Sequence, residues 1–142
     1  MSKLTNDEIA MLELAIEGDL ELFTSDWVLR AKELDAPDAE LKERAQKAIR
    51  VLVEKGLVVL SRRSAWIGGT ETKLPLAQYG DVLLNPATWE KPEGDSTPYL
   101  CCAATPEEER GFYLREEVQA YFRSVYKKHA PAQQNAGDSS AL

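Results

Sequence analysis

Seven basic side chains lie between positions 42 and 63, and the chemistry of six of them can be stated before any fold is considered. The first four have helical spacing, and the last two lie on the apolar segment that follows: Lys42, Arg44, Lys47, Arg50, Arg62 and Arg63. A guanidinium group can clamp a phosphate, or it can form two parallel hydrogen bonds with the edge of a guanine. This segment is therefore the candidate nucleic-acid contact.

The charge of the rest of the chain has the opposite sign. Residues 1–41 carry 3 basic and 11 acidic side chains (net −8), residues 42–63 carry 7 and 2 (net +5), and residues 64–142 carry 7 and 11 (net −4). The sum is the −7 of the whole chain, whereas nucleic-acid-binding domains are usually basic. Glu43 and Glu54 also fall near the centre of the basic helix face. The alternative interpretation is that these lysines and arginines only solvate an exposed face.

Three helices are expected before Gly56. Thr5 and Glu8 form a capping box that opens a helix over about 6–17, where apolar residues recur three and four apart. A short strand over 20–23 precedes a second helix, whose buried stripe is expected to be Trp27, Val28, Ala31 and Leu34. A third helix over about 39–55 has one apolar face, formed by Leu41, Ala45, Ala48, Ile49, Leu52 and Val53. An apolar strand over 57–60 follows.

Two segments carry a family resemblance. Residues 48–58, AIRVLVEKGLV, pass from the third helix through a glycine into a strand, and residues 99–107, YLCCAATPE, join a strand to a helix start. Residues 48–58 resemble the winged helix-turn-helix superfamily, and residues 99–107 resemble the returning wing strand and following helix of MarR- and PadR-like proteins. The resemblance spans residues 5 to about 126. It implies an α+β, mainly α, winged-helix domain over 1–128, with three N-terminal helices, a two-stranded wing and a C-terminal helix.

The resemblance also assigns roles to the basic residues. It implies that the third helix, with Lys42, Arg44, Lys47 and Arg50, enters the major groove of double-stranded DNA, and that Arg62 and Arg63 contact phosphates beside it. A usual wing loop is short, whereas here residues 64–98 place 35 residues between the wing strands. Because a structureless loop of this length is uncommon in a compact domain, we expect this insert to carry its own helix, ending near Leu84, and to pack on the body.

A long C-terminal helix is expected from Thr105 to about Lys128, with Thr105 as its cap. Its apolar stripe is formed by Leu114, Val118, Tyr121, Phe122 and Val125. The simplest interpretation is that this stripe packs on the first helix. The resemblance implies a further role as a homodimer interface, because MarR- and PadR-like proteins dimerise through such a helix. Residues 129–142 have the composition of a disordered tail.

Signatures of catalysis are absent from the sequence. Phosphate-binding glycine motifs are missing, His129 is the sole histidine, and Cys101 and Cys102 are neighbours on an expected strand, so their side chains point to opposite faces. We therefore expect no enzyme, no catalytic residue, no cofactor and no metal site. No run approaches the ~18 apolar residues of a membrane span, and the first residues lack a signal peptide's apolar segment. The expectation is a cytoplasmic protein without a membrane partner.

Two functions are consistent with these patterns. One is a small, dimeric, winged-helix transcriptional regulator that binds DNA through the six basic residues. The other is a winged helix used as a protein-binding module, such as an immunity protein, an antitoxin or a phage-encoded inhibitor. The acidic N-terminal third and the oversized insert motivate the protein-binding module, because an acidic surface suits a basic protein partner.

Overall fold

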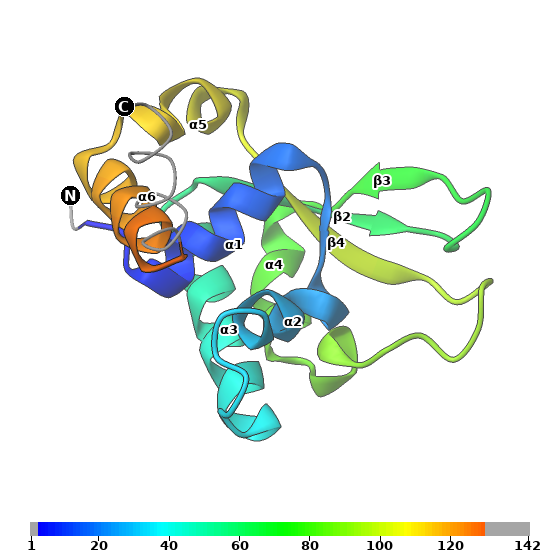
Figure 1. Ribbon diagram of the computed structural model, residues 1–142. Helices are drawn as coiled ribbons and strands as arrows, with labels where there is room; N and C mark the ends of the chain where they lie inside the picture. Colours follow the sequence, from blue (N-terminus) through cyan, green and yellow to red (C-terminus); the bar gives the residue numbers. More distant parts are fainter. Residues whose placement is uncertain (1–2, 130–142) are drawn as a thin grey trace, which may run out of the picture.

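The computed structural model describes residues 3–129 and shows an α+β protein that is mainly helical (Figure 1). Its helices are α1 (Asn6–Glu17), α2 (Ser25–Arg30), α3 (Asp38–Glu54), α4 (Tyr79–Leu84), α5 (Pro106–Gly111) and α6 (Glu116–His129). Its strands are β1 (Leu20–Glu21), β2 (Val58–Arg63), β3 (Glu71–Lys73) and β4 (Tyr99–Ala104). Short 3-10 turns are η1 (Leu22–Thr24), η2 (Leu76–Gln78), η3 (Pro86–Trp89) and η4 (Phe112–Leu114).

The four strands form one antiparallel sheet in the order β1-β4-β2-β3. Leu60 lies opposite Cys102, and both side chains belong to the hydrophobic core beneath the helices. Because side chains alternate along a strand, Ser61 and its opposite residue Cys101 point to the other side. Arg63, opposite Tyr99, shares that side, which we call the outer face of the sheet.

The first and third helices agree with the sequence patterns. In the capping box of α1 the Thr5 hydroxyl accepts a hydrogen bond from the Glu8 N–H at 3.2 Å, and the Glu8 carboxylate accepts one from the Thr5 N–H at 3.3 Å. The face of α3 that was expected to be apolar is buried, apart from Val53, which is partly buried. Local spacing therefore determines both helices.

The expected buried stripe of the second helix is wrong. Trp27 lies within α2 but is 61% exposed. Ala31 and Leu34 are exposed because α2 ends at Arg30 and leaves them in the following loop. Val28 is partly buried, and Leu29 is the residue that α2 places in the core. The Arg30 guanidinium stops the helix by donating to the Leu34 carbonyl at 2.8 Å and pairing with Asp38 at the start of α3.

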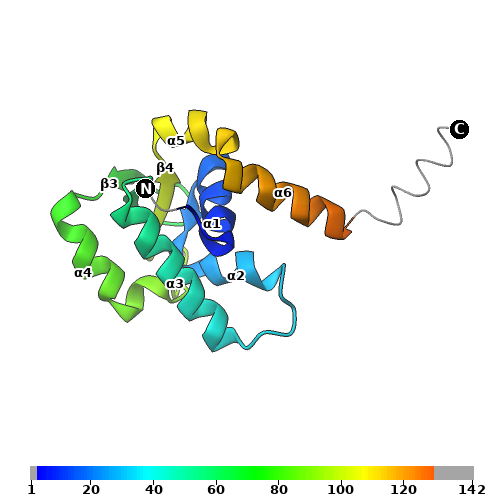
Figure 2. The ribbon, with the colours of Figure 1, turned by 90° about the vertical axis from the view of Figure 1, so that its left-hand side faces the viewer.

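The insert over 64–98 carries its own helix and packs on the body, as expected. Leu74, Tyr79, Leu83 and Trp89 join the hydrophobic core. The Tyr79 hydroxyl accepts a hydrogen bond from the Leu60 N–H of β2 at 2.9 Å. The insert also adds β3 to the far side of β2, so the expected two-stranded wing is instead part of a four-stranded sheet. Viewed from the side, α4 lies next to α3 (Figure 2).

The expected continuous C-terminal helix is broken into α5, η4 and α6. Phe112 is fully buried at the break, and Arg115 is extended. The Arg115 guanidinium makes two hydrogen bonds, of 2.7 and 2.8 Å, to the buried carboxylate of Glu108, which fixes the corner. Leu114 consequently faces solvent instead of continuing the stripe. The backbone of α6 extends through His129, and the rest of the expected tail, 130–142, lies outside the described residues.

Candidate interaction surfaces

Arg44 is used to hold the fold together. Its guanidinium donates two hydrogen bonds to Asp7 of α1, at 3.0 and 2.8 Å, and two more to Glu33, at 3.0 and 2.5 Å. The hydrogen bonds with Asp7, and then those with Glu33, raise the pKa of Arg44 above its ordinary value. Since α3 is tied to α1 by these donors, Arg44 has a structural partner for its charge.

The two arginines at the end of β2 point to opposite sides of the sheet. Arg63 lies on the outer face, where its guanidinium is 3.6 Å from the carboxylate of Asp19. Arg62 is exposed on the other side and lines a hollow with Asn85 and Thr88 of the insert. The structure therefore does not bring Arg62 and Arg63 together on one surface.

Lys42, Lys47 and Arg50 remain on the surface of α3. Lys42 and Arg50 line a groove of about 260 Å³ between α3 and the insert, where Trp89 and Glu90 form the opposite wall. Lys47 is exposed on a separate strip of the helix, with these acidic neighbours at helical spacing: Glu40, Glu43 and Glu54. The strip around Lys47 therefore carries more carboxylates than cations, with Arg50 at its edge.

The five residues of the expected dimer stripe have different environments. Val118 and Tyr121 lie in the core of the protein itself, where α6 contacts α1. Phe122 and Val125 are partly buried against that core, and Leu114 is 76% exposed. Packing within one chain thus accounts for Val118 and Tyr121. A role of the stripe in dimerisation stays a prediction.

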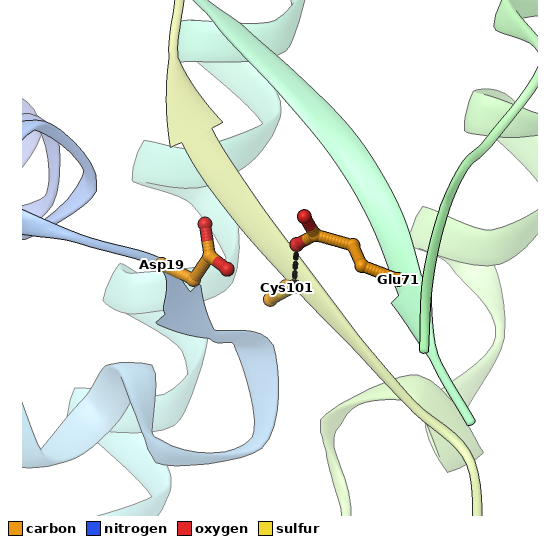
Figure 3. Close-up of side chains that lie close together, drawn as sticks. All are labelled: Asp19, Glu71 and Cys101. Carbon is orange, nitrogen blue, oxygen red and sulfur yellow. Dashed lines mark hydrogen bonds between the residues drawn. The ribbon is translucent and has the colours of Figure 1, made fainter. Parts of the chain in front are cut away.

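The outer face of the sheet holds a cluster that the sequence did not indicate. Figure 3 shows the Asp19 and Glu71 carboxylates facing one another beside Cys101 of β4. The three ligand atoms lie within 4.8 Å of one another. Glu71 accepts hydrogen bonds from the Ser61 hydroxyl at 3.0 Å and from the Cys101 thiol at 3.5 Å. We call Asp19, Glu71 and Cys101 the acidic cluster.

Hydrogen bonds and burial shift the pKa values of this acidic cluster. Burial, then the hydrogen bond and repulsion from Glu71, raise the pKa of Asp19, whereas the hydrogen bonds from Asp19 and Ser61 lower the pKa of Glu71. Burial raises the pKa of Cys101 to about 11. Two carboxylates and a thiolate could ligate a metal ion, but these hydrogen bonds account for the arrangement without one.

Beside the acidic cluster lies an aromatic surface. The rings of Phe23, Trp66 and Tyr99 contact one another, with centroid distances of 5.4 Å (Phe23–Tyr99), 5.6 Å (Trp66–Tyr99) and 6.1 Å (Phe23–Trp66). Trp27 and Trp66 line a groove of about 470 Å³ whose other lining residues are Phe23, Thr24 and residues 91–95. We call this hollow the aromatic groove. Sequence reasoning took Trp27 for a core residue and gave Trp66 no role beyond the insert.

Comparison with known proteins adds no assignment. No family model, curated protein or solved structure matches this chain. Among residues 3–129, no helix combines the length and the apolar character needed to cross a membrane. The function must therefore be inferred from the surfaces of the chain itself.

Proposed function

We propose that this chain is a protein-interaction module, and the observation that carries the proposal is the aromatic groove. Trp27 is 61% exposed and Trp66 49% exposed, and both line the same hollow. An indole in water leaves a large apolar area unburied, and tryptophan is among the residues that dominate binding energy at protein interfaces. Two exposed indoles beside one groove are therefore best explained by a partner that covers them.

A winged-helix body is part of the proposal. The order of elements supports it, because α1, α2 and α3 precede β2, and β4 returns antiparallel to β2 over six residue pairs. In this interpretation residues 64–98 replace a short wing loop with a packed subdomain. The two free, buried cysteines suit the expected cytoplasmic location.

The distribution of charge favours a protein partner over DNA. Arg44 is paired with two carboxylates, Arg63 faces the outer face of the sheet, and the exposed strip of α3 carries three glutamates with Lys47. Phosphates would be repelled by such a strip. An immunity protein, an antitoxin or a phage-encoded inhibitor that binds a basic protein would use such surfaces.

Site-specific photo-crosslinking tests this proposal in the cell that produces the protein. A benzophenone amino acid at position 66 should yield a discrete cross-linked protein species, which excess unlabelled wild-type protein suppresses. The same photoprobe at position 76, an exposed residue of η2 outside the aromatic groove, is the control. Equal cross-linking at both positions, or cross-linking to nucleic acid alone, would contradict an interaction module that uses the aromatic groove.

DNA binding is the second candidate function, and one observation favours it. Within the part of the chain that the structure describes, Lys42, Lys47, Arg50 and Arg62 have no carboxylate within 4.0 Å. Anisotropy of a labelled random duplex at about 50 and 200 mM salt tests it, because release of counterions makes phosphate contacts strongly salt-dependent. Lys47→Ala with Arg50→Ala should lower the salt slope by about 2. Lys3→Ala with Arg110→Ala, on exposed residues before α1 and in α5, is the charge-matched control.

A homodimer belongs to this DNA-binding candidate. Tyr113 and Phe122 line an open, largely apolar hollow at the start of α6, next to the exposed Leu114. Pairing of two copies there would present two α3 helices to a palindromic site. Sedimentation equilibrium of the wild type and Leu114→Ser distinguishes the states, and a monomer in both cases would contradict the dimer.

A further inference from the structure

We infer that the aromatic groove binds an arginine side chain carried by a basic segment of a protein partner. This inference rests on the proposed function, because it names the chemistry of the partner that the same groove would take. It follows from the arrangement of the rings, the charge around them and the way the groove is held open.

The rings define where a cation can sit. Phe23, Trp66 and Tyr99 are 5.4–6.1 Å apart, centroid to centroid, which is the distance of rings in mutual contact. They leave no space between them for an ammonium group, so they do not form an aromatic cage. The exposed aromatic surface belongs to Trp66 and Trp27, which both line the groove. A flat group that stacks on an indole fits this geometry.

The charge around the rings is negative. Glu93 and Asp95 line the aromatic groove. An adjoining hollow of about 430 Å³, which shares Trp66, is lined by Asp19 and Glu21. Against these four carboxylates stand Arg63 and Lys91, a formal net charge of −2. In the described part of the chain, Glu21, Glu93 and Asp95 have no basic partner within 4.0 Å. The groove therefore lacks cations to balance its carboxylates.

The groove is also organised before any partner arrives. The Trp66 backbone N–H donates to the Asp95 carbonyl at 2.9 Å, so the first and last parts of the insert are held side by side. The Thr97 N–H donates to the Gly94 carbonyl at 3.1 Å and closes the turn. Contact with Phe23 and Tyr99 orients the Trp66 ring. Binding need not first order these groups, which lowers its entropic cost.

An arginine side chain fits both the exposed indoles and the negative charge of the groove. A guanidinium is planar, stacks on an indole and donates several hydrogen bonds in one plane, which carboxylates at the rim can accept. Unpaired nucleic-acid bases also stack on indoles, but their phosphates would meet Glu93 and Asp95. The carboxylates therefore favour a basic peptide over a single strand.

The three tryptophans give a direct measurement. In the ¹⁵N-labelled full chain, each indole N–H yields one NMR signal, and Trp89 is an internal reference because it is buried and donates to the Leu83 carbonyl at 3.2 Å. The probe is a short Gly/Ser peptide that carries arginines, and its control is the same peptide with neutral citrulline. The arginine peptide should shift the Trp27 and Trp66 signals, leave Trp89 in place, and bind about 2- to 30-fold more tightly than the citrulline peptide.

Variants locate the binding and decide the outcome. Trp66→Ala and Asp95→Asn should each weaken the arginine peptide several-fold, whereas Leu84→Ala, at an exposed residue of α4, should not. Equal affinity for both peptides, or tighter binding of a single-stranded oligonucleotide at the same signals, would overturn the inference. Cross-linking of a protein at position 66 without binding of the arginine peptide would overturn the inference alone. If position 66 cross-links to no protein and the arginine peptide does not bind, the proposed function is contradicted as well.

Discussion

The surface of α3 and the outer face of the sheet differ in how their residues are distributed along the sequence. The basic residues of α3 are concentrated within one helix, yet Arg44 and Lys55, the residue that follows the helix, pair with acidic residues of α1 and of the loop after α2. The outer face collects its residues from the end of α1, the turn before α2, β3, the insert and β4. A run of charge in the sequence therefore overestimates the free charge of a surface, and a site assembled from distant segments leaves no run at all.

The same contrast applies to the tryptophans. Trp89 closes the groove between α3 and the insert as a buried residue, and Trp66 borders the outer face as an exposed one. Trp89 contributes to folding, and Trp66 is available for binding. Replacing Trp89 and Trp66 separately tests this division between a folding and a binding tryptophan.

Replacing Trp89 should have the largest effect on stability. Trp89→Ala removes a buried indole and leaves the Leu83 carbonyl without its donor, so we expect a loss of about 3–5 kcal/mol in the free energy of unfolding. Trp66→Ala should cost about 1 kcal/mol, because mainly ring contacts are lost. Urea denaturation followed by circular dichroism measures both. A similar loss in the two variants would contradict the division into a folding and a binding tryptophan.

The cysteine of the outer face should be chemically inert in the native protein. Cys101 is buried, and the raised pKa of about 11 leaves about one thiol in a thousand ionised at pH 8. Modification by a disulfide reagent should therefore be at least about 100-fold slower than for an unfolded control in urea. Rapid reaction of one thiol in the native chain would show that the acidic cluster opens to solvent.

Arg44 should behave as a structural residue. Arg44→Met leaves Asp7 and Glu33 without a shared donor, and because these groups are partly exposed we expect a loss of about 1–2 kcal/mol. Lys47→Met, on the exposed strip of the same helix, should change the free energy of unfolding by less than about 0.5 kcal/mol. Thermal or urea unfolding compares the pair. Equal stability of the two variants would show that Arg44 is not needed for the fold and is available to bind a partner.

The parts of the fold that follow from local pattern were predictable. The capping box at Thr5 and Glu8 determines the start of α1, and the spacing from Leu41 to Leu52 determines the buried face of α3. The stripe through Trp27 and Leu34 was wrong because α2 is too short for periodicity to define its buried face. The continuous C-terminal helix was wrong because the Glu108–Arg115 pair and the buried Phe112 form a corner that helix propensity does not reveal.

The candidate site could not be found in the same way. Asp19, Glu71 and Cys101 are separated by 52 and 30 positions, and the pairing of β3 with β2, of β2 with β4 and of β1 with β4 brings them together. The sequence places Trp66 in the insert, but which side of the sheet it covers depends on the hydrogen bond to Asp95 and on contact with Phe23. These are tertiary contacts, for which a single sequence carries no periodic signal.

The smallest effect concerns the ionisation of Asp19 in the acidic cluster. A pKa of Asp19 that is raised in the folded state stabilises the fold at low pH, and this contribution is lost as the pH rises through the folded-state pKa. In Asp19→Asn the amide still donates to Glu71 but carries no charge. The stability of this variant relative to the wild type should therefore rise between about pH 4 and pH 7, by less than about 1 kcal/mol because the Asp19 side chain is 33% exposed. Urea midpoints of both proteins at the two pH values measure it. A relative stability that falls instead would show that the Asp19–Arg63 pair outweighs the repulsion between Asp19 and Glu71.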